Sequence, residues 1–112
     1  MPPADKSARA LQFLGLAAKA GRVVIGVPLI CTELRKSSQV QMVLSACDAS
    51  DNTKKKLNDK CKYYGVALCE LPYTADQLAA AVGKDAPIGA VAVTDARLLQ
   101  TVKEHLPKPA QD

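Results

Sequence analysis

Residues 19–36 read KAGRVVIGVPLICTELRK, and this stretch sets the pattern for the rest of the chain. Gly21 and Gly26 bracket the short apolar run 22–25, which predicts a strand between two turns. The residues after it repeat apolar side chains at helical spacing, and Pro28 suits the first turn of a helix, where its missing N–H has no intrahelical partner to lose. The first N–H groups of such a helix can bind a phosphate, although an ordinary strand-to-helix connection explains the same residues.

Short apolar runs and segments with helical spacing alternate along the whole chain. The predicted helices cover residues 5–20, 27–37, 53–64, 75–82 and 95–106, and the predicted strands cover residues 22–25, 40–46, 66–71 and 90–94. The run 40–46 is nearly all apolar, as expected for a strand buried on both faces, and the run 66–71 predicts another buried strand. This alternation predicts an α/β/α arrangement with a mixed or mostly parallel sheet. The expected organisation is one domain over residues 5–106, between a flexible arm at 1–4 and a flexible tail at 107–112.

Several residues predict how the helices begin and pack. Asp48 and Ser50 precede the third helix and can cap it, Thr74 can cap the fourth, and Asp95 opens the last. Gly15 lies inside the first helix, where glycine is unfavourable by about 1 kcal/mol relative to alanine. We therefore expect a close packing contact at Gly15.

The composition indicates a soluble, cytoplasmic protein. The chain has 112 residues, 48% of them apolar, and no apolar run approaches the ~20 residues that span a bilayer. The first residues, MPPADK, lack the order of a secretory signal. The four cysteines form no C-x-x-C pair, and the single histidine, His105, is remote from them in sequence. We therefore expect reduced thiols and neither a metal nor a cofactor.

The charge is unevenly distributed along the chain. Residues 1–65 hold eleven Lys and Arg against five Asp and Glu, whereas residues 66–112 hold four against six. Such asymmetry favours a polyanionic partner, and nucleic acid is the commonest one. The lysines at 54–56 are either a contact for such a partner or a solvated helix face.

The sequence lacks the usual catalytic motifs. It contains no G-x-x-x-x-G-K-[ST], no G-x-G-x-x-G and no G-x-S-x-G. An enzyme would have to use Cys61, which Lys60 and Lys62 flank, together with His105, or else Asp48 at a strand end. We expect no enzymatic activity.

Four segments in one order resemble the bacterial YlxQ-like proteins of the L7Ae/L30e/S12e/Gadd45 ribosomal protein family. They are LGLAAKAGRVVIG (14–26), DASDNTKKKL (48–57), DKCKYYGV (59–66) and AVTD (92–95). The resemblance covers about residues 10–100 and implies a three-layer α/β/α sandwich with a small mixed four-stranded sheet. It also implies a monomeric protein without catalytic activity that binds kink-turn RNA in translation or ribosome assembly, with ribosomal particles as further partners.

The resemblance places the RNA site at the start of the second helix and in the loop before the last strand. At these places Gly21, Arg22 and Gly26 would meet phosphates, and the loop residues would form an apolar wall against extruded bases. The RNA-binding residues implied in this way, with the neighbouring lysines, are Lys19, Gly21, Arg22, Gly26, Val27, Pro28, Leu29, Thr32, Lys36, Ala86, Pro87 and Ile88.

The second helix departs from the pattern of the archaeal members, which have Asn, Glu and Lys where this chain has Pro28, Leu29 and Thr32. Pro28 and Leu29 offer no side-chain hydrogen bond to a base. Two alternatives follow. RNA binding persists, weaker and with relaxed specificity, through phosphate contacts from Arg22, Lys19, Lys36 and the helix N-terminus. Alternatively, Pro28 and Leu29 form a protein-interaction surface.

Overall fold

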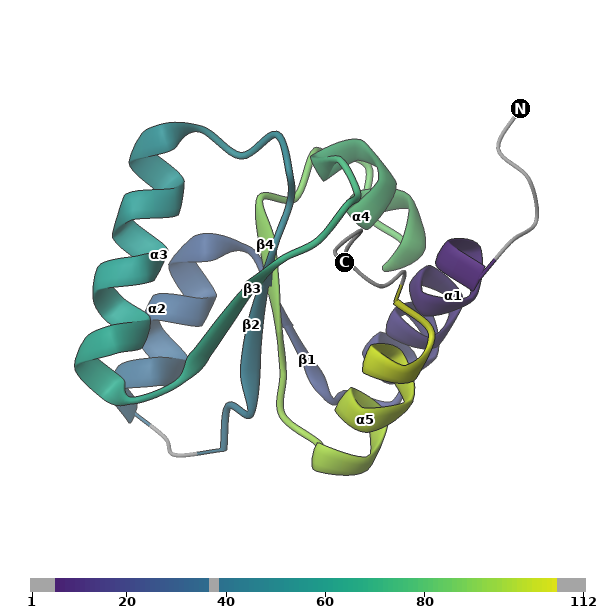
Figure 1. The fold of residues 1–112 in the computed structure, drawn as a ribbon, viewed down its shortest axis with the longest axis horizontal. Coiled ribbons are helices and arrows are strands. Elements are labelled where there is room, and N and C mark those ends of the chain that lie inside the picture. Colours follow the sequence, from purple (N-terminus) through teal and green to yellow (C-terminus); the bar gives the residue numbers. More distant parts are fainter. Residues whose placement is uncertain (1–5, 37–38, 107–112) are drawn as a thin grey trace, which may run out of the picture.

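Four short strands form one mixed sheet in the spatial order β1-β4-β2-β3 (Figure 1). They are β1 (Val23–Ile25), β2 (Met42–Ser45), β3 (Ala67–Glu70) and β4 (Ala90–Val93). The computed structural model describes residues 6–36 and 39–106; the predicted arm at 1–4, the tail at 107–112 and positions 5, 37 and 38 lie outside the described residues. β2 and β3 are parallel, whereas β4 is antiparallel to both of its neighbours. The sheet is therefore mixed, as predicted, and the alternative of a mostly parallel sheet is wrong.

Five helices cover the two faces of this sheet, which gives the three layers that the sequence predicts (Figure 1). Helices α2 (Val27–Lys36) and α3 (Asp51–Tyr64) pack together on one face. Helices α1 (Lys6–Lys19), α4 (Ala75–Ala81) and α5 (Ala96–Glu104) lie on the other face. None of the helices in the described ranges is long and apolar enough to cross a membrane.

The central strand β4 divides the buried core into two clusters. All four of its residues are buried. Because successive side chains of a strand point to opposite faces, Val91 and Val93 join the cluster beneath α1 and α5, and Ala90 and Ala92 join the one beneath α2 and α3. At the edge of the sheet, β3 exposes Ala67 and only half-buries its two middle residues. The prediction that residues 66–71 form a buried strand is therefore wrong, because an edge strand packs against fewer neighbours.

The predicted capping residues are confirmed, with one change of partner and one shifted helix start. The Ser50 hydroxyl accepts a hydrogen bond from the Thr53 N–H of α3 (3.2 Å), and Thr74 and Asp95 cap α4 and α5. Asp48 caps a different helix from the expected one, since its Oδ1 accepts from the Ala75 N–H of α4 (2.8 Å). The third helix begins two residues before the predicted position 53, because Ser50 is its capping residue.

The expected close contact at Gly15 is confirmed. A Cβ placed on Gly15 would lie 2.5 Å from the carbonyl oxygen of Ala81, which is backbone and cannot turn aside. Glycine therefore lets α1 approach the end of α4 more closely than any other residue allows.

Candidate nucleic-acid interface

Gly26 joins strand β1 to helix α2 in a single residue. Its N–H donates to the Ala90 carbonyl (3.1 Å), which ends the ladder with β4, and its own carbonyl accepts from the Ile30 N–H (3.0 Å), which begins the helix. Gly26 has a φ of 95°, a conformation that a residue with a Cβ adopts only under strain. Val27 and Pro28 follow directly in the first turn. The chain thus turns sharply enough to bring the first N–H groups of α2 to the surface.

The loop at residues 84–89 lies against this helix start. A Cβ placed on Gly89 would lie 3.6 Å from the Val27 side chain and 3.8 Å from the Thr53 side chain. The Ile88 N–H donates to the carbonyl of Ala75, the first residue of α4 (3.1 Å). The structure therefore brings together the starts of α2 and α3 and the loop before β4 at one end of the molecule.

The side chains at this end are mostly apolar and exposed. Leu29 is 58% exposed, and Pro28, Ala86 and Pro87 are exposed as well. Ile88 is only 8% exposed and belongs to the core cluster, so little of its side chain is open to a surface wall, and its contact with RNA stays a prediction.

Three of the expected contact residues lie away from this end. Gly21 and Arg22 are at the opposite end of β1, where the Arg22 carbonyl accepts from the N–H (2.9 Å) and the hydroxyl (3.0 Å) of Thr94. The Arg22 guanidinium lies 4.0 Å from the Asp95 carboxylate and remains largely exposed. Lys36 is in the last turn of α2, 3.7 Å from Glu33. The sequence places Arg22 and Gly26 close together, but the extended strand separates them.

A line of hollows along β1 connects two lysines to the helix start. Lys19 and Lys84 both line a hollow of about 410 Å³ that also includes Ile25. Lys84 and Ile25 also line the adjacent hollow of about 370 Å³, which reaches Leu29. Lys84 is not among the residues predicted from the sequence, although it is the one basic residue of the loop at 84–89 and that loop was already a candidate. A cation here could contact a phosphate bound near the start of α2.

Thr32 lies one turn into α2, at the position where the archaeal pattern has a lysine. Its hydroxyl donates to the Pro28 carbonyl (3.1 Å). That bond engages the hydroxyl hydrogen within the helix, so Thr32 can offer RNA an acceptor but no charge.

The three side chains considered as catalytic candidates, Cys61, His105 and Asp48, are buried or already take part in packing or hydrogen bonds. Cys61 is buried, and burial followed by the nearby Cys31 raises the pKa of its thiol, which disfavours the reactive thiolate. His105 packs against Phe13 with ring centroids 4.8 Å apart, and its Nδ1 lies 2.9 Å from the Thr101 carbonyl. Asp48 caps α4. Among residues 6–36 and 39–106, no group of three or more His, Cys, Asp or Glu is arranged to hold a metal ion.

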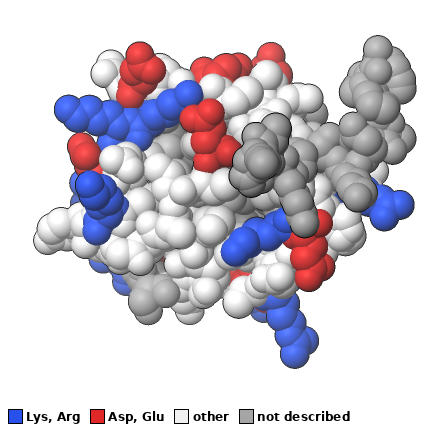
Figure 2. Space-filling view, viewed as in Figure 1, with Lys and Arg blue, Asp and Glu red and all other residues white. Residues whose placement is uncertain are grey.

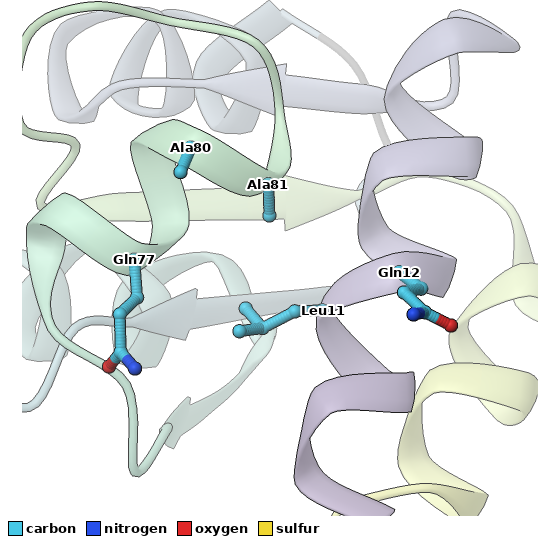
Figure 3. Close-up of a pocket in the computed structure, with 5 residues that line it drawn as sticks. All are labelled: Leu11, Gln12, Gln77, Ala80 and Ala81. Atoms are coloured by element: carbon cyan, nitrogen blue, oxygen red, sulfur yellow. The ribbon is translucent and has the colours of Figure 1, made fainter. Parts of the chain in front are cut away.

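A further hollow of about 380 Å³ opens between α1 and α4 (Figure 3). Its lining residues are Leu11, Gln12, Gln77, Ala80 and Ala81. The Leu11 side chain points across the gap toward α4 (Figure 3). None of these five side chains titrates, so this hollow offers no acid, base or nucleophile.

Comparisons with known proteins agree on one family. The family model described as "Ribosomal protein L7Ae/L30e/S12e/Gadd45 family" matches residues 8–103. "RNA-binding protein YlxQ" of Bacillus subtilis (strain 168) is 44% identical over 83 residues, 74% of this chain and 80% of that protein. "RNA-binding protein YlxQ" of Enterococcus faecium is 37% identical over 76 residues, 68% of this chain and 72% of that protein.

Two solved structures share the fold. A protein of unknown function from Bacillus halodurans has a TM-score of 0.77 and 30% identity, over 88% of this chain and 97% of the other. The 15.5kD RNA binding protein of Giardia lamblia has a TM-score of 0.71 and 17% identity, over 94% of this chain and 88% of the other. The second likeness supports the fold alone. On the evidence of the family model and the 44% identical relative, this chain is a YlxQ-like member of the L7Ae/L30e/S12e/Gadd45 ribosomal protein family.

Proposed function

We propose that this chain is a non-catalytic RNA-binding protein that holds structured RNA of the kink-turn type at the start of α2. The observation that carries the proposal is the convergence of two segments: the glycine turn at Gly26 and the loop at 84–89 meet where α2 begins. The helix N-terminus attracts phosphate, and the exposed Pro87 and Leu29 offer apolar surface to unstacked bases. The relatives named RNA-binding protein YlxQ support the same proposal.

Affinity in this proposal comes mainly from phosphate contacts. Lys19 and Lys84 border the hollows that lead to the helix start, and Arg22 extends the basic surface to the other end of β1. Pro28 and Leu29 make no polar side-chain contact to bases, so the protein binds with relaxed specificity and strong salt dependence. We place this activity in the cytoplasm, in translation or ribosome assembly, in keeping with the ribosomal family.

A binding measurement decides between kink-turn recognition and generic duplex binding. Wild-type protein is titrated against a kink-turn duplex and against the same duplex without its bulge, at several salt concentrations. We expect tighter binding to the kinked RNA. Equal affinity for the two RNAs would contradict the kink-turn part of the proposal.

Placing polar side chains at the start of α2 tests whether residues 28 and 29 face the bases of the bound RNA. The double change Pro28→Asn and Leu29→Glu should raise the preference for the kinked duplex by about tenfold, because each new hydrogen bond to a base discriminates against the control RNA. Leu16→Glu is the matched control, since Leu16 is 55% exposed on α1 and carries the same change of charge. No gain from the double change would show that the alignment of α2 with the family pattern is wrong.

The exposure of Leu29 favours a second candidate, a protein-interaction module on the same fold. Pro28 and Leu29 are both exposed, and Leu29 lines the hollow along β1. In a pull-down from nuclease-treated lysate, a partner that survives removal of RNA and is lost with Leu29→Glu, but kept with Leu16→Glu, would support this candidate.

A further inference from the structure

Helix α3 carries an exposed stripe that the proposed site does not use. Tyr63 is 80% exposed, and Lys56 and Lys60 precede it at spacings of seven and three residues, so the three side chains share one face of the helix. We call these three residues the α3 stripe. A tyrosine ring this open to water leaves most of its apolar surface uncovered, and Lys56 and Lys60 lie on the same face of the helix.

The stripe lies on the side of α3 that is turned away from strand β3. Lys54 marks the other side, because its Nζ lies 3.2 Å from the Glu70 carboxylate on β3 and donates to the Cys47 carbonyl (3.0 Å). Lys56, two residues later, is on the opposite side of the helix. Within the part of the chain that the structure describes, neither Lys56 nor Lys60 has an ion pair. Their charges are therefore available to a partner.

The stripe is continuous with the proposed RNA site because α2 and α3 run side by side in the same direction. Their starts lie on either side of Gly89, where an added Cβ would be in van der Waals contact with both Val27 of α2 and Thr53 of α3. Their ends meet at a hollow of about 440 Å³, which is lined by Leu34, Arg35, Lys36, Val40, Tyr64, Gly65 and Val66. A strand that leaves the start of α2 can therefore follow the two helices to Arg35, over roughly 15 Å of helix.

The charge of this surface fits a polyanion. Helix α3 holds five lysines and two aspartates, and Arg35 adds a further exposed cation at the end of α2. Figure 2 shows Lys and Arg side chains along the part of the surface that α3 occupies in Figure 1, with acidic side chains interspersed. Asp59 lies between Lys56 and Lys60 in sequence and reduces the positive potential, so the surface is suited to a few phosphates rather than to a long duplex.

We propose that the α3 stripe binds an unpaired RNA strand that continues from the RNA held at the start of α2. Lys56 and Lys60 contact its phosphates, and the Tyr63 ring stacks on one base. The ring of Tyr64 meets Tyr63 edge-on with centroids 4.8 Å apart, which limits the orientations of the exposed ring. An unpaired strand fits better than a duplex because stacked bases inside a helix present no free face to Tyr63. This inference rests on the proposed function, since that site delivers the strand.

The test compares a blunt kink-turn duplex with the same duplex carrying an unpaired extension of about six nucleotides at one end or the other. Wild-type protein should bind one of the extended RNAs about tenfold more tightly than the blunt RNA. Tyr63→Ala, and separately Lys56→Ala with Lys60→Ala, should remove this gain without changing the affinity for the blunt RNA. The double lysine variant should also lower the salt slope on the extended RNA by about 1 to 2.

Two controls separate this site from general charge and from loss of the aromatic ring. Arg97→Ala with Lys103→Ala removes two exposed cations from α5, on the other face of the sheet, and should leave the gain intact. Tyr63→Phe keeps the stacking ring and should also retain it. A duplex extension that gives an equal gain, or a gain that survives Tyr63→Ala, would overturn the inference.

The same titrations distinguish the two proposals. If wild-type protein prefers the blunt kinked duplex over its unbulged control but gains nothing from any extension, the inference about the α3 stripe is wrong and the proposed function stands. If the wild type shows no preference for the kinked duplex, the kink-turn proposal is wrong, and the inference that depends on it is wrong as well.

Discussion

Helices α4 and α2 begin in contrasting ways. At the start of α4, Thr74 accepts from the Gln77 N–H (3.1 Å), Gln77 accepts from the Thr74 N–H (2.8 Å), and Asp48 accepts from the Ala75 N–H (2.8 Å). At the start of α2 the chain has Gly26, Val27 and Pro28, and the described structure records no capping side chain there. Three side chains thus occupy the first turn of a seven-residue helix, while the ten-residue helix is left open.

The capped start of α4 and the uncapped start of α2 illustrate two roles of a helix N-terminus, one in stability and one in ligand binding. A short helix gains much of its stability from its caps, because few of its N–H groups have partners within the helix. An open first turn keeps its N–H groups for a ligand and takes its stability from packing, which Ile30 and Leu34 supply in α2. Substitutions at the capped starts should therefore lower stability, and those at the α2 start should mainly change binding.

The largest expected effect on stability is at the start of α4. Thr74→Ala removes the hydroxyl of a reciprocal capping pair and should lower the free energy of unfolding by about 1–2 kcal/mol, measured by urea denaturation. Because the Ile88 N–H donates to the Ala75 carbonyl, the loop before β4 should also lose protection from hydrogen exchange. Thr101→Ala is the matched control in α5 and should be nearly neutral. Equal losses at the two positions would show that capping is not the cause.

A smaller difference in stability is expected between substitutions at the start of α3 and at the start of α2. Ser50→Ala removes the hydroxyl that accepts from the Thr53 N–H and should lower the free energy of unfolding by about 1 kcal/mol. Pro28→Ala removes no cap. The change gives the unfolded chain more freedom, which destabilises the fold, and improves helix propensity, which stabilises it. The free energy of unfolding should therefore change by no more than about 0.5 kcal/mol. Urea denaturation of both variants measures the contrast. A loss at Pro28 as large as that at Ser50 would mean that α2 depends on its first turn for stability.

The caps show what local sequence can predict. Ser50, Thr74 and Asp95 were recognisable because a capping side chain acts on N–H groups two or three residues away. Asp48 was recognised as a cap but assigned to the nearer helix, because its true partner Ala75 is 27 residues away. The edge position of β3 was likewise invisible, since strand order depends on contacts between segments far apart in the sequence.

The candidate site shows the same limit. The resemblance to the family predicted one site from the start of the second helix and the loop before the last strand, and the structure brings Val27 and Gly89 together there. Arg22 was grouped with Gly26 because four positions separate them, but an extended strand spreads four residues over about 13 Å. Lys84 was missed because only the fold brings it to Lys19 along β1.

The smallest expected effect is a pH dependence of stability, which should be present for the charged cap Asp95 and absent for the neutral cap Ser50. Hydrogen bonds from the Leu98 and Arg97 N–H groups, with the nearby charge of Arg22, hold the pKa of Asp95 below its ordinary value. A lowered pKa in the folded state means that the ionised carboxylate adds stability above the pKa of the unfolded chain, about 3.9, and that this stability is lost as the pH falls below it. The stability difference between wild type and Asp95→Ala should therefore be constant near neutral pH and shrink in acid. The Ser50→Ala difference should stay flat over the same range, because a hydroxyl does not titrate there. Urea denaturation of the three proteins at a series of pH values measures both differences, and a flat Asp95 difference would show that its cap acts without its charge.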